Sequence, residues 1–184
     1  VRTGLPLRNP DGQEIILGDH AGQVNSIEVS QDGQTITTNF LDNTTRLWNV
    51  KTGLPLRNPG GEEIILIGHT ASNVLSISFS QDSETLAAGS RDGTTRLWDV
   101  RTGQSLRSPD GQEIILGGHT SSVNSVSFSP DGQTLATVSR DGTTRLWNVR
   151  TGQPLRNLGG EEIILRGSTY AVNHISFSPD GQTL

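Results

Sequence analysis

The chain of 184 residues contains 22 glycines, no cysteine and no methionine, and carries a formal net charge of −5 at pH 7. The mild acidity argues against a general role in nucleic-acid binding, and the absence of cysteine excludes disulfides and thiolate metal sites. No apolar run approaches the roughly 18 residues that a membrane-spanning helix needs. A chain without cysteine is typical of a reducing compartment, so we expect a cytoplasmic protein with neither a nucleic-acid nor a membrane partner.

One segment recurs three times, each time around a tryptophan. It reads LDNTTRLWNV, RDGTTRLWDV and RDGTTRLWNV, which places successive tryptophans 50 and 49 residues apart at Trp48, Trp98 and Trp147. A period of this length is typical of a repeat architecture. We expect one partial array over residues 1–184 with about 3.7 repeat units, at approximately 1–50, 51–100, 101–149 and a truncated 150–184.

Within a unit, short strands alternate with turns, and the third unit shows the order most clearly. Residues 105–107 and 113–116 are predicted strand pieces around a Ser-Pro-Asp-Gly turn, with 113–116 as the outermost strand. Strands are then predicted at 123–129, 134–139 and 143–149. A Pro-Asp-Gly turn separates the first pair, and the Asp-Gly pair at 141–142 is a strong hairpin signal. No helical periodicity intervenes, so an all-β antiparallel meander is expected.

The strands carry apolar residues on both faces. Val126 and Phe128 share one parity and Val123 has the other, while Leu146 and Trp147 are adjacent. A strand that is apolar on both faces is covered on both faces. Sheets stacked face to face around an axis satisfy this requirement, so we expect a β-propeller of four-stranded antiparallel blades.

The recurring residues resemble those of the WD-repeat family. The third unit carries Gly-His, then Val-Asn-Ser-Val-Ser-Phe-Ser-Pro-Asp-Gly, then Ser-Arg-Asp-Gly and Thr-Arg-Leu-Trp-Asn-Val. The resemblance extends over essentially the whole chain. The units of 49–50 residues exceed the family's usual ~40–45, and their near identity resembles bacterial tandem arrays. Because both ends fall inside a unit, we expect either a fragment of a longer propeller or a homo-oligomer.

The resemblance implies a hydrogen-bonded tetrad in each blade, which joins a histidine, a hydroxyl of the second strand, the turn aspartate and the tryptophan. In the third unit the candidates are His119, Asp141, Trp147 and either Thr137 or Ser139. The second unit offers His69, Ser90, Asp92 and Trp98, with Ala88 where Thr137 would be. The first unit offers His20, Thr38, Asp42 and Trp48, and the fourth has Ser168 in place of histidine.

Histidine, serine and aspartate together also suggest a catalytic triad. Recurrence of the set at equivalent places favours a structural role, because buried polar groups that bond each other specify a structure. The acid pairs at 62–63 and 161–162 point to opposite faces of a strand and are interpreted as solvated surface. Lone Asp-Gly turns lack the ligand series of a calcium loop. We therefore expect no catalytic residue, no metal and no cofactor.

Positions that differ between units are candidates for partner binding. In the WD-repeat family the loops after the histidine and before the turn aspartate border the face on which partners dock. The candidates there are Leu41, Arg91, Arg140 and Tyr170, and arginine and tyrosine are enriched at interface hot spots. Neutral variation of exposed loops is an equal alternative.

The expected function is therefore that of a non-enzymatic scaffold or sensing module that binds a protein or peptide on the top face of a propeller. One alternative is a small-molecule hydrolase or metal-binding propeller that uses the central channel, where Glu28 and His174 are the only ionisable residues expected. A second alternative is a purely architectural array whose role is self-association.

Overall fold

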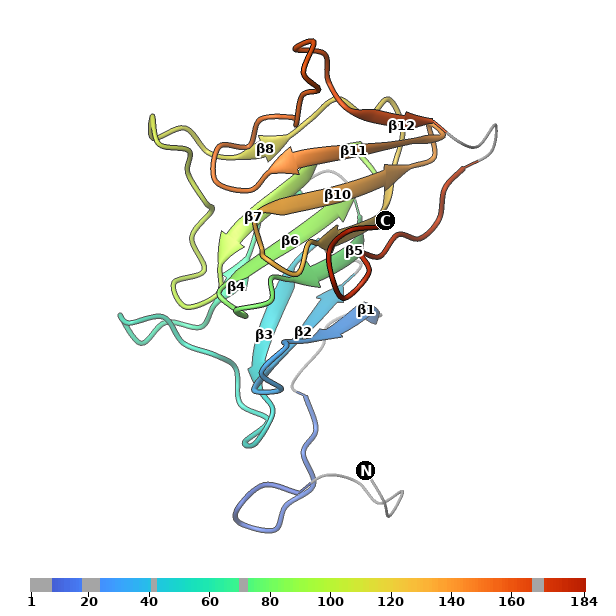
Figure 1. Ribbon diagram of the computed structural model, residues 1–184. Helices are drawn as coiled ribbons and strands as arrows, with labels where there is room; N and C mark the ends of the chain where they lie inside the picture. Colours follow the sequence, from blue (N-terminus) through green and yellow to red (C-terminus); the bar gives the residue numbers. More distant parts are fainter. Residues whose placement is uncertain (1–7, 18–23, 41–42, 70–72, 167–170) are drawn as a thin grey trace.

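The computed structural model describes residues 8–17, 24–40, 43–69, 73–166 and 171–184 (Figure 1). These residues form twelve β-strands and no helix, which confirms the predicted all-β class. None of the described segments therefore provides a helix that could cross a membrane. The strands associate into three four-stranded sheets, as expected for a partial propeller.

Each sheet is one blade, and within each blade the strands are antiparallel neighbours in chain order. Blade I contains β1 (Val24–Val29), β2 (Thr35–Phe40), β3 (Thr45–Asn49) and β4 (Ile65–Leu66). Blade II contains β5 (Val74–Phe79), β6 (Thr85–Ser90), β7 (Thr95–Asp99) and β8 (Ile115–Leu116). Blade III contains β9 (Val123–Phe128), β10 (Thr134–Ser139), β11 (Thr143–Asn148) and β12 (Ile164–Arg166).

The predicted hairpin turns form at the Asp-Gly pairs between the second and third strands. Gly142 has φ of 80°, the left-handed conformation that glycine adopts without steric cost. At the equivalent place in blade I, Asn43 has φ of 69°, which asparagine tolerates better than other residues with a side chain. We call the end of the blades that carries these turns the top face.

The outermost strand comes from the segment that follows each tryptophan. In blade II, Leu116 lies opposite Thr95 of β7, so the outermost strand predicted at 113–116 is confirmed for residues 115–116. Arg107 bridges Glu113, so the extra residues of each unit form a hairpin at the outer rim, visible at the periphery of Figure 1. Each blade thus takes three strands from one repeat unit and its outer strand from the next.

The apolar core lies between successive blades. One cluster joins blade I to blade II and contains Leu47, Ile64, Leu66, Val74, Ile77, Phe79 and Trp98. The other joins blade II to blade III and contains Leu97, Ile114, Leu116, Val123, Val126, Phe128 and Trp147. Covering both faces of a blade in this way explains why its strands carry apolar residues at both parities.

The two outer sides of the array are less covered. On β1, Ile27 is 58% exposed, whereas the equivalent Ile77 and Val126 are 7% and 4% exposed. Residues 8–17 cover part of this side, since Ile15 lies against Gly53 as Ile64 lies against Gly103 of the next blade. At the other side, residues 171–184 lie along β9, and the Asn124 amide donates to the Val172 carbonyl at 3.1 Å.

Candidate functional site

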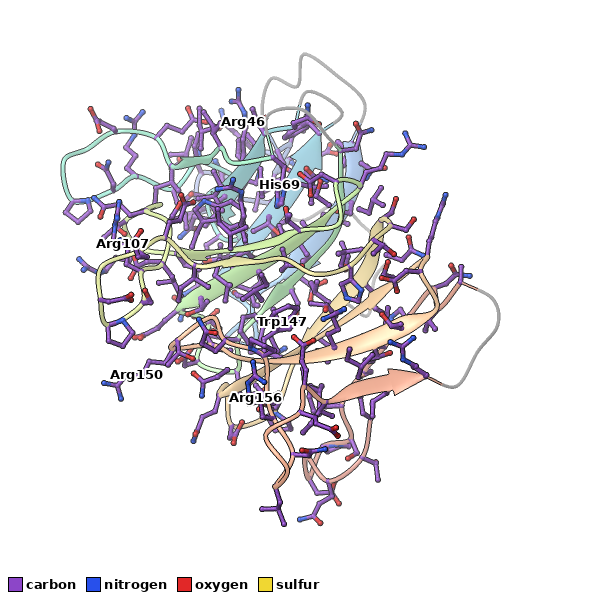
Figure 2. All side chains as sticks on the ribbon, turned by 90° about the horizontal axis from the view of Figure 1, so that it is seen from above. Arg46, His69, Arg107, Trp147, Arg150 and Arg156 are labelled. Carbon is purple, nitrogen blue, oxygen red and sulfur yellow. The ribbon has the colours of Figure 1, made fainter. Side chains whose placement is uncertain are left out.

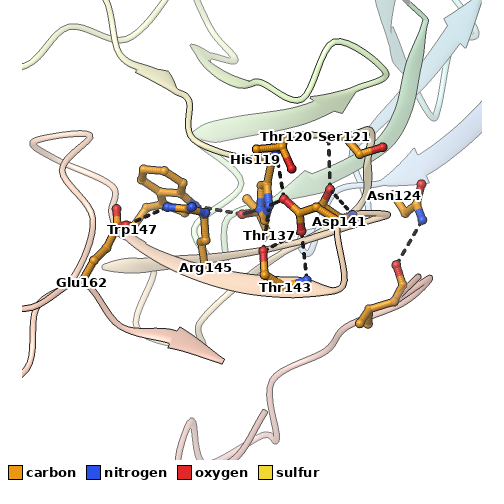
Figure 3. Close-up of polar contacts among 12 residues, drawn as sticks. His119, Thr120, Ser121, Asn124, Thr137, Asp141, Thr143, Arg145, Trp147 and Glu162 are labelled. Atoms are coloured by element: carbon orange, nitrogen blue, oxygen red, sulfur yellow. Dashed lines mark hydrogen bonds and ion pairs between the residues drawn. The ribbon is translucent and has the colours of Figure 1, made fainter. Parts of the chain in front are cut away.

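The third blade contains a continuous chain of hydrogen bonds from a strand tryptophan to the top-face turn (Figure 3). The Trp147 indole N–H donates to Thr137 Oγ1 at 2.9 Å, and Thr137 Oγ1 lies 2.8 Å from His119 Nε2. His119 Nδ1 lies 3.0 Å from Asp141 Oδ2. Because an ionised carboxylate only accepts, Nδ1 carries the proton and Nε2 accepts from the Thr137 hydroxyl.

Burial and hydrogen bonding fix the protonation states of this chain. Burial lowers the pKa of His119, and the Asp141 contact offsets this only in part. Burial alone would raise the pKa of Asp141, but hydrogen bonds from the Thr143 hydroxyl, the Thr120 amide and His119 outweigh it and lower that pKa. A neutral histidine therefore holds a charged aspartate through a hydrogen bond.

The second blade builds the same chain without its hydroxyl. His69 Nδ1 lies 3.3 Å from Asp92 Oδ2, and His69 Nε2 faces the Ala88 carbonyl at 3.1 Å. Ala88 offers no side-chain oxygen to the Trp98 indole, which lies edge-on to the His69 ring with the ring centroids 6.1 Å apart. Burial lowers the pKa of His69, so the neutral ring has one proton for two acceptors. The Ser90 hydroxyl donates to the Asn73 carbonyl at 3.2 Å.

Only part of the set in blade I can be placed. The Trp48 indole donates to Thr38 Oγ1 at 2.7 Å, as Trp147 does to Thr137. His20 and Asp42 lie outside the described residues. Of the two hydroxyls that the sequence left open in blade III, Thr137 joins histidine to tryptophan, whereas Ser139 donates to the Ser121 carbonyl at 3.0 Å.

The geometry of the His119 chain suits a structural tie rather than catalysis. The Thr137 residue is 0% exposed and the His119 side chain 1% exposed, so no substrate could reach the hydroxyl. The chain links β10 and β11 to the loop before β9, because its members come from all three. Buried, mutually satisfied polar groups of this kind fix one arrangement of their elements.

On the top face, Arg91 and Arg140 occupy equivalent turns of adjacent blades, and both are exposed. The Arg91 amide donates to the Asn73 carbonyl at 2.9 Å, and the Arg140 amide donates to the Ser122 carbonyl at 3.0 Å. These bonds hold the two backbones in the same position relative to their blades. Neither arginine takes part in an ion pair within the described residues. Leu41 and Tyr170 lie outside the described residues.

The inner strands line an open cavity of about 760 Å³, and we call its surface the concave wall. Glu28 and His174 both contribute to this wall. Burial raises the pKa of Glu28. Among the described residues, no group of three or more His, Cys, Asp or Glu side chains comes together in a way that could hold a metal ion.

One repeated interaction was not expected from the sequence. An arginine of the third strand pairs with a glutamate 17 residues later, across to the outer segment, in Arg46–Glu63 at 3.1 Å, Arg96–Glu113 at 2.6 Å and Arg145–Glu162 at 2.7 Å. Glu63 and Glu162 were interpreted as solvated surface, but each holds its outer segment against its blade. Recurrence of the same spacing in three units was the signal that could have revealed these pairs.

Similarity to known proteins supports the same architecture. The family model described as WD domain, G-beta repeat, matches residues 12–49, 61–99 and 110–148. No curated protein sequence matches the chain. Two solved structures share its fold, "Crystal structure of RRP9 WD40 repeats" and "Structure of U3-55K", each with a TM-score of 0.71 and 22% identity over 87% of this chain.

The chain spans less than half the length of these two structures, since it covers 43% of the first and 44% of the second. At this identity the likeness concerns the fold alone. The matched family model, however, extends over more than half of the sequence. With three four-stranded blades and the histidine-to-tryptophan chain in place, the protein belongs to the WD-repeat family of β-propellers.

Proposed function

We propose that the protein is a non-enzymatic scaffold or sensing module that binds a protein or peptide on its top face. The observation that carries the proposal is the pair of exposed arginines Arg91 and Arg140 on adjacent blades, neither of which forms an ion pair with another described residue. The repeated framework presents nearly identical side chains elsewhere, so specificity depends on the few positions that differ. Propeller folds of the WD-repeat family typically act as such scaffolds.

The chemistry of the two arginines favours an extended acidic or phosphorylated segment as the ligand. A guanidinium group binds carboxylate or phosphate through two parallel hydrogen bonds. Two such groups one blade apart suit two anionic side chains of one extended peptide. The net charge of −5 does not oppose this, because recognition at the top face is local.

A matched pair of double variants tests the proposal. Arg91→Ala with Arg140→Ala removes the top-face pair, whereas Arg101→Ala with Arg150→Ala removes exposed arginines that follow the third strands at the opposite end. Figure 2 shows Arg150 pointing outward from the blades. On an array of acidic and serine-phosphorylated peptides, we expect the first double variant to lose binding and the second to retain it. Equal binding by all three proteins would refute the proposal.

Self-association is the second candidate, and the open side of blade I favours it. Ile27 is exposed there, although its counterparts on β5 and β9 are buried by a preceding blade. An uncovered apolar sheet surface tends to associate with another sheet. We expect the chain of 184 residues to form a homo-oligomer at micromolar concentration, unless further blades of a longer chain cover this side. A stable monomer by light scattering would contradict this candidate.

The residues of the concave wall give less support to the hydrolase alternative. It requires several ionisable groups around the channel, and among the described residues of the concave wall only Glu28 and His174 are ionisable. Ester or lactone hydrolysis that disappears in Glu28→Gln or His174→Gln variants would favour it over the scaffold.

A further inference from the structure

The concave wall at the centre of the array has an unusual charge distribution. It is built from β1, β5, β9 and residues 171–184, and serine hydroxyls and amide side chains dominate its polar lining. Among the described residues that line it there is no lysine and no arginine, and Glu28 and His174 are the only ionisable ones. Near neutral pH the carboxylate of Glu28 is therefore the main charge on this surface.

Glu28 departs from the repeat at a position that does not require a charge. The equivalent residues in the other units are Ser78, Ser127 and Ser176. On β1, Glu28 lies opposite Thr37 of β2, in the same register as its counterparts in the other blades. Because serine supports this strand position elsewhere, the glutamate is not needed to form the blade.

The carboxylate of Glu28 is partly desolvated and lacks a counterion. Within the described residues no ion pair involves it, including none with His174. Burial disfavours the charged form of Glu28 and so raises its pKa. A cation placed beside it would remove this cost, because opposite charges attract strongly where water is partly excluded.

A second polar group on the same strand also lacks a partner. Ser26 and Glu28 are two residues apart on β1 and therefore face the same side. Within the described part of the chain, Ser26 Oγ is buried with no hydrogen-bond partner. In the following blades, Ser76 and Ser125 accept the Val126 and Ile175 amides at 3.2 Å and 3.4 Å. Ser26 is thus an acceptor without the donor that its counterparts have.

We propose that Glu28 and Ser26 form a binding site in the central concave wall for an organic cation, an ammonium or guanidinium group. Such groups carry several N–H donors, which match a carboxylate and a hydroxyl oxygen. The cation comes from a lysine or arginine side chain of a protein partner or from a free amine. This site is separate from the top-face arginines, since its charge and its ligand are of the opposite sign.

The test compares capped peptides with a free amine. Acetyl-Gly-Lys-Gly-amide and acetyl-Gly-Arg-Gly-amide carry a side-chain cation, n-butylammonium is the free amine, and acetyl-Gly-norleucine-Gly-amide is the uncharged control. Binding is followed by NMR shifts of backbone amides in β1. Glu28→Ser installs the residue of the other units, so the fold should be retained, and Glu28→Gln removes only the charge. Glu62→Ser, on the outer rim, is the matched surface control.

We expect saturable binding of the cationic probes that weakens at least about tenfold in both Glu28 variants, since a charge-assisted hydrogen bond is lost, and is unchanged in Glu62→Ser. Tighter binding of a peptide than of n-butylammonium identifies a partner side chain as the source, and equal binding identifies an amine site. No saturable binding by any cation, or binding that Glu28→Ser leaves intact, would overturn the proposal. Equal binding of the norleucine peptide would overturn it as well.

Discussion

Thr137 is the hydroxyl on which the tie in blade III depends, and replacing it should destabilise the fold by a predictable amount. Thr137→Val keeps the shape and the β-branch but removes the oxygen between Trp147 and His119. His119 Nε2, which accepts from the Thr137 hydroxyl, then loses its donor. The Trp147 indole then remains as the unsatisfied buried donor, at a cost of about 1–3 kcal/mol. We expect the free energy of unfolding to fall by about 2 kcal/mol.

Urea denaturation followed by tryptophan fluorescence measures this change. Thr137→Ser is the matched control, because it keeps the hydroxyl and loses one buried methyl group, worth about 0.8 kcal/mol. The reverse substitution, Ala88→Thr, supplies blade II with the missing hydroxyl and should stabilise the protein by about 1 kcal/mol. If Thr137→Val is no more destabilising than Thr137→Ser, the hydroxyl does not link histidine to tryptophan.

Two further predictions concern pH and packing between blades. Burial lowers the pKa of His69 and His119 below the ordinary 6.5, so below pH 6.5 the unfolded chain takes up protons that the folded chain does not, and the free energy of unfolding should decrease. Urea midpoints at pH 7.5 and 5.5 check this in a Glu28→Gln background, because the raised pKa of Glu28 acts in the opposite direction; an equal or higher midpoint at pH 5.5 would contradict it. Gly103→Ala should cost more stability than Gly111→Ala, because both glycines have positive φ but only at Gly103 would the new Cβ meet Ile64, at 2.7 Å from its Cγ2. Equal melting temperatures for the two variants would contradict the close packing of Ile64 against Gly103.

Much of the fold was predictable because the same strand and turn signals recur in successive repeat units. The strands predicted at 123–129, 134–139 and 143–149 correspond to β9, β10 and β11 within a residue. Strand periodicity and Asp-Gly turns are local signals, and recurrence in several units separates them from chance. The outer strand was also predictable, because its apolar residues follow a turn at the same place in each unit.

The polar contacts were less predictable because they depend on register between strands. Thr137 and Ser139 lie on the same face of β10, so a two-residue period cannot distinguish them. Their positions opposite β11 distinguish them, since Thr137 pairs with Arg145, two residues from Trp147. The Arg145–Glu162 ion pair likewise joins strands whose alignment no local pattern specifies. The concave wall around Glu28 requires residues from all three blades, so only the folded array reveals it.

Hydrogen–deuterium exchange on a complex tests the top-face proposal most directly. The chain is mixed with the tightest-binding acidic or phosphorylated peptide from the array, and amide exchange is compared with and without it. We expect slower exchange at the two top-face turns around Arg91 and Arg140, and no change at the opposite-end turns around Arg101 and Arg150. Slower exchange confined to the opposite-end turns or to the outer-rim hairpins would contradict it.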